Sequence, residues 1–143
     1  MKKVLVLNGP NLNMLGVREP EIYGFDTLES INAEILEYAK ARDIECDFFQ
    51  SNCEGELITK IHTVLTEYDG CVINAGAYTH YSYAIRDAIA CVHKPFIEVH
   101  LSDVNAREDF RKISVITEVC RSAIAGYGKR SYTMAIDTLK EII

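Results

Sequence analysis

The feature that most constrains the fold is a regular alternation of short strand-like segments and amphipathic helical segments. Strands are expected at residues 3–8, 45–50, 70–74, 96–100 and 122–125. Several of these are continuous apolar runs, which are typical of strands buried on both faces. The alternation therefore predicts an α/β fold, with a parallel sheet covered by helices on both sides.

The helical segments carry apolar residues every three or four positions. Asp26 is the expected N-cap of the first, with Glu29 three residues later, and Pro95 is expected to close the third. A single helical turn is expected at 107–111. The apolar positions are Leu28, Ile31, Ile35, Tyr38 and Ala39; Leu57, Ile61, Val64, Leu65 and Tyr68; Ala84, Ile85, Ala88, Ile89 and Val92; and Tyr132, Ala135, Ile136, Leu139 and Ile143.

Length and composition fit one domain spanning residues 1–143. The 143 residues are 48% hydrophobic, enough to bury a core. Five parallel strands favour the order 2-1-3-4-5, in which the chain reverses direction across the sheet between strands 1 and 3. Ligands of such sheets bind outside the carboxyl ends of the strands, close to that reversal.

The charge and the start of the chain exclude several classes of protein. A net charge of -6 disfavours nucleic acid and anionic membranes as partners, because like charges repel. Only four apolar residues, 4–7, precede Asn8, whereas a secretory leader needs roughly 7 to 15. No run approaches the roughly 18 apolar residues of a membrane span. We expect a cytoplasmic protein.

The five cysteines do not indicate a metal site or disulfides. They form no C-x-x-C pair and have no histidine at zinc-ligand spacing. We expect reduced and mostly structural thiols, with Cys71 and Met14 among the core residues, and no metal.

Three loops at the carboxyl ends of strands concentrate polar groups: residues 8–24, 74–87 and 98–111. Four of the seven arginines lie there, in a chain that is acidic overall. A local cationic pocket in an acidic protein indicates a small anionic substrate.

Arg18 and Tyr23 share a loop bounded by Gly16 and Gly24, long enough to act as a lid. An unperturbed tyrosine titrates near pH ~10, and a neighbouring guanidinium can lower its pKa enough to make it a usable base. The spacing is equally compatible with a surface tyrosine and a solvated arginine.

Glu98 and His100 are two residues apart on a strand, so they face the same side, where a carboxylate can hold the proton of an imidazole. Without further context, the same pattern also fits a structural core histidine. His62 and His93 are expected to be structural or exposed.

Three other functions are disfavoured by the residues. The stretch 126–131 is close to a dinucleotide-binding G-x-G-x-x-G motif, but it follows the last strand, and Ser131 replaces the third glycine. A flavin-binding loop would need Ser and Thr after the first strand. A receiver domain would need an acidic cluster there and an Asp at the end of the third strand. The chain has Asn8 and Asn11 at the first of these places and Asn74 at the second.

The sequence resembles type II 3-dehydroquinate dehydratases from end to end. The motif NGPNLNMLGVREPEIYG at residues 8–24 is similar to the first signature of that family almost residue for residue. The other matching blocks, in order, are FQSNCEG at 49–55, GAYTH at 76–80, RDA at 86–88, EVHLS at 98–102, Arg107, and Phe110 with Arg111.

The resemblance implies a flavodoxin-like three-layer fold and conversion of 3-dehydroquinate to 3-dehydroshikimate through an enolate, without metal or organic cofactor. Tyr23 would be the base, with Arg18 lowering its pKa, and His100, supported by Glu98, would protonate the departing hydroxyl. Asn11 would hold a water that stabilises the enolate oxygen. The substrate carboxylate would bind Asn74, Ser102 and the backbone amides of Leu101 and Ser102, and the ring hydroxyls would bind His80 and Arg111. Arg107 would lie near the lid, and Asp87 would reach into the site of a neighbouring subunit.

The resemblance also implies a homododecamer built from four trimers. The enzyme would act in the shikimate pathway, which makes aromatic amino acids through chorismate, or in quinate breakdown. The sequence leaves these two roles open, and it leaves open a catalytically inactive homologue with the same residues.

Overall fold

The chain folds around a five-stranded parallel sheet with the strand order β2-β1-β3-β4-β5. This computed structural model describes residues 1–17 and 20–143, and at Tyr23 it describes only the backbone. The strands are β1 (Lys2–Asn8), β2 (Ile44–Gln50), β3 (Gly70–Asn74), β4 (Phe96–His100) and β5 (Ser122–Ala125). The predicted order is confirmed, and the chain reverses across the sheet between β1 and β3.

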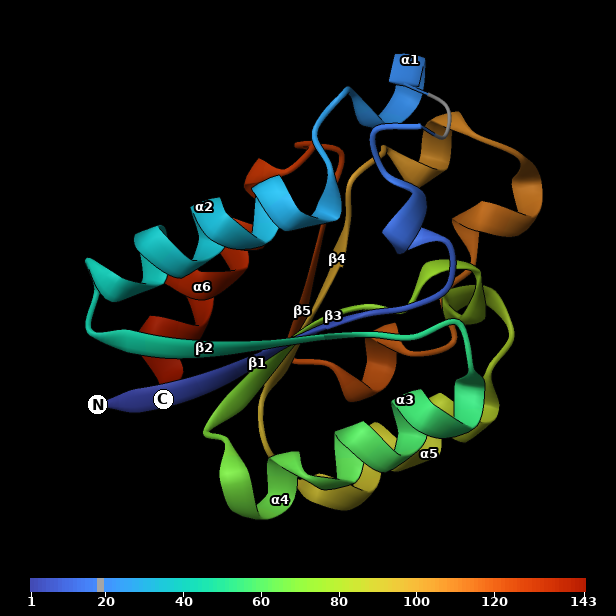
Figure 1. Ribbon diagram of the computed structural model, residues 1–143. Coiled ribbons are helices and arrows are strands. Elements are labelled where there is room, and N and C mark those ends of the chain that lie inside the picture. Colours follow the sequence, from blue (N-terminus) through green and yellow to red (C-terminus); the bar gives the residue numbers. More distant parts are fainter. Residues whose placement is uncertain (18–19) are drawn as a thin grey trace.

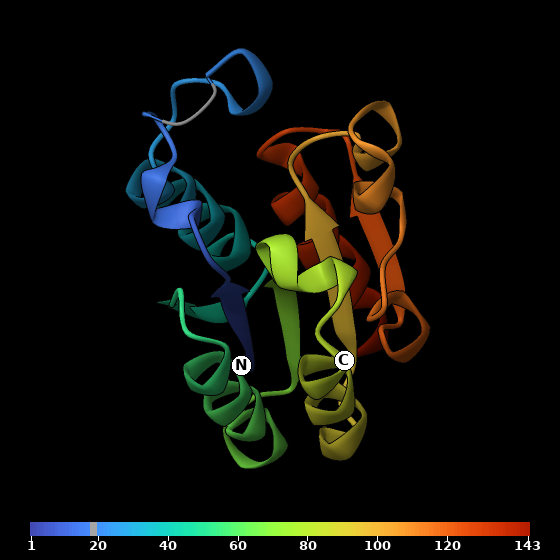
Figure 2. The ribbon, with the colours of Figure 1, turned by 90° about the vertical axis from the view of Figure 1, so that its right-hand side faces the viewer.

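Helices cover both faces of the sheet and give three layers (Figures 1 and 2). One face carries α2 (Leu28–Lys40) and α6 (Arg130–Ile142). The other carries α3 (Glu54–His62), α4 (Val64–Glu67) and α5 (Tyr83–Val92). A short helix α1 (Pro20–Tyr23) lies in the long loop that follows β1.

Strand β1 shows why its sequence lacks polar alternation. Val4 and Val6 pack in the cluster that contains α2 and α6, whereas Leu5 and Leu7 pack in the cluster that contains α3, α4 and α5. All four side chains are buried. Because both faces of the strand are covered by helices, every second position must be apolar on each face, and the run becomes continuous.

Helix α2 begins one residue later than predicted. Its N-cap is Thr27 and not Asp26: Thr27 Oγ1 accepts a hydrogen bond from the Ser30 amide, and Ser30 Oγ accepts one from the Thr27 amide. Ser30 is thus the capping partner that Glu29 was expected to be. Asp26 contributes by accepting a hydrogen bond from Ser30 Oγ at 2.9 Å.

The second predicted helix is interrupted. It is split at Thr63 into α3 and α4, and the Thr63 hydroxyl donates a hydrogen bond to the Lys60 carbonyl at the break. The prediction of one helix that continues to Tyr68 was therefore wrong, because the backbone of Tyr68 is extended. Leu65, expected in the apolar stripe, is exposed, and so is Ala84 on α5.

Three further details differ from the sequence prediction. Helix α5 ends at Val92, where His93 adopts a left-handed φ of 52°, before Pro95 is reached. The turn expected at 107–111 is a 3-10 turn at Asp109–Lys112, preceded by another at Val104–Ala106. Met14, expected in the core, is half exposed.

The cysteines are all free, as expected, but their environments differ. Cys46 and Cys71 are buried, and burial raises the pKa of the Cys46 thiol to about 12. Cys53 and Cys91 are exposed, so they are not structural core residues.

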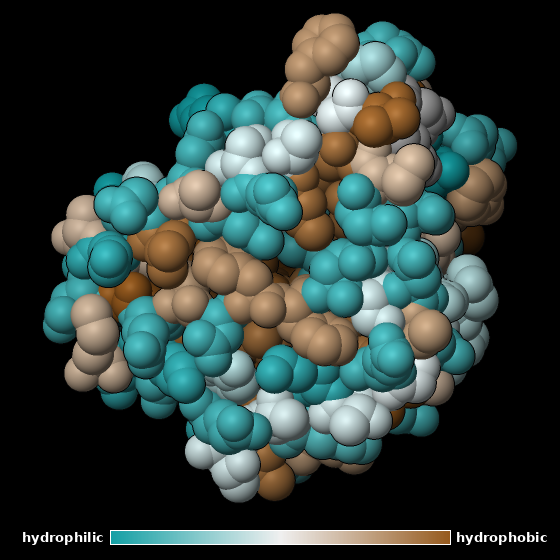
Figure 3. Space-filling model, in the orientation of Figure 1, coloured by the Kyte–Doolittle hydropathy of each residue, from teal (hydrophilic) through white to brown (hydrophobic). Residues whose placement is uncertain are grey.

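On the face seen in Figure 3, apolar side chains gather in a band across the middle, bordered mostly by polar side chains. Among the helices in the two described ranges, none has both the length and the apolar character needed to cross a bilayer.

Candidate active site

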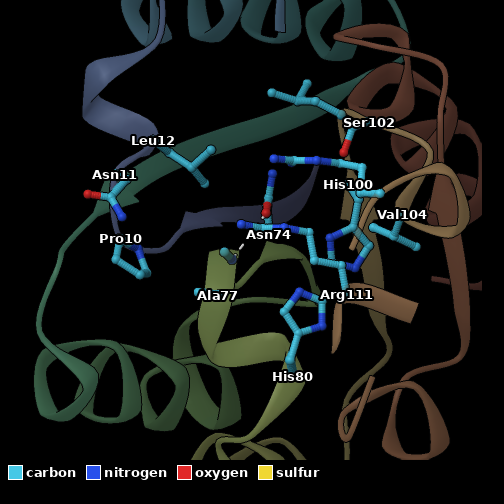
Figure 4. A pocket seen from close by; sticks show the side chains of 13 residues that line it. Pro10, Asn11, Leu12, Asn74, Ala77, His80, His100, Ser102, Val104 and Arg111 are labelled. Atoms are coloured by element: carbon cyan, nitrogen blue, oxygen red, sulfur yellow. Dashed lines mark hydrogen bonds between the residues drawn. The ribbon is translucent and has the colours of Figure 1, made fainter. Parts of the chain in front are cut away.

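A pocket of about 140 Å³ opens at the carboxyl ends of β1, β3 and β4 (Figure 4), where the strand order predicts a ligand. All three loops selected from the sequence contribute to it. Its lining residues are Pro10, Asn11, Leu12, Asn74, Gly76, Ala77, His80, His100, Leu101, Ser102, Val104, Arg107 and Arg111.

Two glycines allow the loops after β1 and β3 to touch. A Cβ atom on Gly9 would lie 2.5 Å from the carbonyl oxygen of Ala75, and one on Gly76 would lie 3.0 Å from that of Pro10. Gly76 also has a φ of 59°, which side chains disfavour. This close approach brings Asn11 and Asn74 to the same pocket.

His100 and Glu98 form a buried pair at the end of β4. The Nε2 atom of His100 lies 2.5 Å from Oε2 of Glu98, and the exposed fractions of the two residues are 9% and 2%. The spacing along the strand predicts this contact, because alternate residues share a face. Of the pair, His100 lines the pocket and Glu98 lies behind it.

The other oxygen of Glu98 is held by two hydroxyl groups. Oε1 accepts hydrogen bonds from Thr117 Oγ1 at 2.5 Å and from Ser114 Oγ at 3.2 Å. Burial acts to raise the pKa of the Glu98 carboxyl, but the hydrogen bonds from His100, Thr117 and Ser114 outweigh it, and the pKa is lowered. Glu98 is therefore an ionised acceptor that fixes the His100 ring and holds a proton on Nε2.

His80 lies beside His100 in the pocket (Figure 4). Their rings are stacked, with centroids 6.5 Å apart, and Phe110 meets His80 edge-on at 5.8 Å. The Nδ1 atom of His80 lies 2.7 Å from the carbonyl oxygen of Ile113, to which it can only donate. In a neutral His80 ring, Nε2 is then the nitrogen that accepts a hydrogen bond.

Asn74 is the last residue of β3, and both the oxygen and the nitrogen of its side-chain amide are hydrogen-bonded. Its Oδ1 atom accepts a hydrogen bond from the Gly76 amide, drawn dashed in Figure 4, and its Nδ2 atom donates to the hydroxyl of Tyr132 at 3.1 Å. Leu101 and Ser102 follow β4 across the pocket. The structure therefore places together the groups expected to bind a carboxylate.

Asn11 adopts a left-handed φ of 70° at the start of the loop after β1. Its backbone amide donates a hydrogen bond to Oδ1 of Asn52, and Nε2 of Gln50 donates to the carbonyl of Gly9. Gln50 at the end of β2 and Asn52 in the loop after it thus hold the segment of Gly9 and Asn11, with Asn11 in a conformation that asparagine tolerates better than most residues.

The arginines of the three loops do not all reach the pocket. Arg107 and Arg111 line it, and Nε of Arg111 lies 3.1 Å from a carboxylate oxygen of Glu108. Arg86 is directed elsewhere, because its guanidinium donates to the Val115 carbonyl and pairs with Glu118 at 3.0 Å. The local cationic character therefore comes from fewer arginines than the sequence indicated.

The remaining predicted site residues are Arg18, Tyr23 and Asp87. Arg18 and the side chain of Tyr23 lie outside the described part of the chain. Asp87 is exposed on α5 and does not line the pocket. His62 and His93 are exposed, as expected.

The sequence prediction missed the residues that support the site from behind. Ser114 and Thr117 bind Glu98, and Tyr132 binds Asn74. No local motif marks them, since each acts across the fold. The glycine-rich stretch 126–131 also has a supporting role, because the Gly128 amide donates a hydrogen bond to the Leu101 carbonyl at 2.9 Å.

Comparison with known protein families gives a match over nearly the whole chain. The sequence model of the family described as Dehydroquinase class II matches residues 2–140. A protein of Caldicellulosiruptor bescii named 3-dehydroquinate dehydratase is 54% identical over 144 residues, covering 100% of this chain and 99% of that protein. One of Bacillus licheniformis with the same name is 52% identical, covering 95% and 94%.

Solved structures agree. The crystal structure of a type II dehydroquinase from Butyrivibrio crossotus is 55% identical, with a TM-score of 0.95, over 96% of this chain and 97% of that one. The type II dehydroquinase of Propionibacterium acnes also gives a TM-score of 0.95, at 39% identity, over 99% and 97%.

Proposed function

The chain belongs to the class II dehydroquinase family, and we propose from this premise that it converts 3-dehydroquinate to 3-dehydroshikimate through an enolate. As a member of this family, it is a 3-dehydroquinate dehydratase, a hydro-lyase. The observation that carries the proposal is the buried Glu98–His100 pair, which opens onto a pocket that also contains two arginines and Asn74.

The proposed elimination begins at the carbon next to the ketone. The phenolate of Tyr23, stabilised by Arg18, takes a proton from this carbon, and the electrons of the C–H bond move onto the ketone oxygen as an enolate. A water held by Asn11 stabilises the enolate oxygen. The position of Asn11 at the edge of the pocket supports its part in this step.

His100 completes the elimination. When the enolate collapses, the bond between carbon and hydroxyl breaks, and the imidazolium of His100 gives its proton to the departing oxygen, so that water and a conjugated enone are formed. The contact with ionised Glu98 supports this role, because the carboxylate orients the imidazole ring and accepts the hydrogen bond from its Nε2.

The substrate carboxylate is proposed to bind Asn74, Ser102 and the backbone amides of Leu101 and Ser102. His80 and Arg111 would hold the ring hydroxyls, and Arg107 would lie near the lid. All of these residues line the one pocket described at the ends of β1, β3 and β4, which supports the assignment.

We further propose a homododecamer of four trimers, in which Asp87 reaches a neighbouring subunit. The exposed position of Asp87 on α5 and the exposed rings of Tyr81, Tyr83 and Phe110 support self-association on this side. A fully active monomer in sedimentation at assay concentration would contradict it. The enzyme is proposed to work in the cytoplasm, in the shikimate pathway or in quinate breakdown.

The experiment is incubation of the purified protein with 3-dehydroquinate, with the conjugated enone followed by its ultraviolet absorbance and the product identified by NMR. We expect conversion that persists with chelators and after borohydride treatment in the presence of substrate. Absence of conversion would contradict the proposed activity. Inactivation by borohydride only in the presence of substrate would instead indicate an imine on a lysine.

A further inference from the structure

Tyr132 connects helix α6 to the pocket without lining it. Its side chain is wholly buried, and its hydroxyl lies 3.1 Å from Nδ2 of Asn74 and 2.5 Å from Oδ1 of Asn8. Asn8 ends β1 and Asn74 ends β3, and the two residues are paired in register. One hydroxyl group therefore bridges the two strands where the pocket begins.

The donor and the acceptor can be assigned for each hydrogen bond in the series that links Gly76, Asn74, Tyr132 and Asn8. The Gly76 amide can only donate, so the atom of Asn74 that faces it is the oxygen, and the nitrogen faces Tyr132. Burial raises the pKa of Tyr132, so the hydroxyl keeps its single proton. That proton is donated to Asn8, and the Tyr132 oxygen accepts from Asn74.

This arrangement leaves one N–H of Asn74 for a ligand. The amide nitrogen carries two hydrogens, and Tyr132 accepts one of them. Since Asn74 lines the pocket, the second hydrogen can be donated to an anionic group bound there. If the amide turned over, its oxygen would take the place of this donor and would repel a carboxylate.

Resting on the proposed function, we infer that Tyr132 is a positioning residue for the substrate carboxylate, because it holds the Asn74 amide with its nitrogen available to that group. The opposite side of the carboxylate site is braced by the same part of the chain. Gly128, four residues before Tyr132, donates its amide hydrogen to the Leu101 carbonyl. Tyr132 in the first turn of α6 and Gly128 just before this helix thus support both sides of the carboxylate site.

Tyr132→Phe is the test, because it removes the hydroxyl and keeps the ring. We expect KM to rise about tenfold, as for the loss of one hydrogen bond to a charged group, while kcat stays within about twofold. Calorimetry should show the same loss for a cyclohexene carboxylate inhibitor. The matching inhibitor with hydroxymethyl in place of carboxylate should bind as tightly as it does to the wild type.

Tyr68→Phe is a matched control. Tyr68 is also buried, and its hydroxyl donates to Oδ2 of Asp47 at 2.7 Å, but it precedes β3, at the end of the sheet away from the pocket. This variant should lose stability in a similar way, with KM and both inhibitor affinities unchanged.

A double-variant cycle separates positioning from a general structural effect. In an Asn74→Ala background, Tyr132→Phe should cause no further loss of carboxylate affinity. An additive loss, or an equal loss for both inhibitors, would overturn the inference. If Tyr132→Phe does not fold, Asn8→Ala serves instead, because it removes the acceptor of the Tyr132 hydroxyl. Normal affinity of Asn8→Ala for the carboxylate inhibitor would also overturn the inference.

Failure of this inference can be told apart from failure of the proposed function. The inhibitor comparison measures binding and needs no turnover. A wild-type protein that does not convert 3-dehydroquinate contradicts the function, whereas equal binding of the carboxylate by wild type and Tyr132→Phe contradicts only the role of Tyr132.

Discussion

Oε2 of Glu98 lies 2.5 Å from Nε2 of His100, and the carboxylate is 2% exposed. The second oxygen of Glu98 is occupied by the hydroxyls of Ser114 and Thr117. A carboxylate held from both sides has little freedom to turn, so it fixes both the orientation of the imidazole and the nitrogen that carries its proton.

The first prediction concerns the charge of Glu98. Glu98→Gln should lower kcat by about a hundredfold, because a neutral amide does not replace the carboxylate that accepts the hydrogen bond from Nε2 and orients the His100 ring. Glu118→Gln is the control, since Glu118 is an exposed carboxylate that pairs with Arg86. Steady-state kinetics with 3-dehydroquinate give the comparison, and a Glu98→Gln enzyme with normal kcat would show that the pair does not act in catalysis.

Glu98 should also contribute to stability in a pH-dependent way. Its pKa is lower in the folded protein than the ordinary value of 4.5, so the ionised carboxylate stabilises the fold above that value, and the contribution is lost as the pH falls through the folded pKa. At pH 7, wild type should exceed Glu98→Gln by about 1–3 kcal/mol in free energy of unfolding. Urea unfolding between pH 7 and 3 should show this gap narrowing, and a constant gap would contradict the assignment.

Gly9 should be sensitive to a single added methyl group. In Gly9→Ala the new Cβ would meet the Ala75 carbonyl at 2.5 Å, so we expect a loss of about 1–3 kcal/mol in free energy of unfolding, together with reduced activity. Gly55→Ala is the control: it lies on α3 with no atom near the new Cβ, and it should be neutral or stabilising by up to about 1 kcal/mol. Equal stability of the two variants would be evidence against a close contact at Gly9.

The proposed base makes a prediction about the acid limb of the pH profile. An unperturbed phenol would be almost wholly protonated at neutral pH, so the proposal that Tyr23 is the base requires Arg18 to favour its phenolate. In Arg18→Gln, the acid limb of kcat/KM should move to higher pH and activity at pH 7 should collapse. Arg42→Gln, which removes a guanidinium paired with Asp137, should leave the limb unchanged. An unmoved limb in Arg18→Gln would mean that the base is wrongly assigned.

The sheet and the pocket could be predicted from the sequence because they follow from local periodicity. Continuous apolar runs and the β-α alternation located five parallel strands, a number that favours the order 2-1-3-4-5, and the two-residue spacing of Glu98 and His100 predicted that their side chains meet. Helix boundaries were less predictable. Asp26 and Thr27 are both residue types that cap helices. The N-cap of α2 is Thr27, because Thr27 and Ser30 form reciprocal hydrogen bonds.

The supporting residues could not be predicted, because their contacts join distant parts of the chain. Tyr132 and Asn74 are separated by 58 residues, and their contact depends on how α6 is rotated against the sheet. Arg86 was expected among the polar groups of the pocket. Its long side chain instead reaches Glu118, 32 residues away, which no local pattern specifies.

The central claim is that His100 protonates the departing hydroxyl, and the most direct measurement compares two substrates on His100→Ala. One is 3-dehydroquinate, and the other carries fluoride in place of the departing hydroxyl. Fluoride leaves without a full proton transfer, so the variant should lose turnover of 3-dehydroquinate by about a hundredfold or more while eliminating fluoride at a rate close to the wild type. Tyr23→Phe should lose both reactions. Equal loss of the two reactions in His100→Ala would contradict the claim.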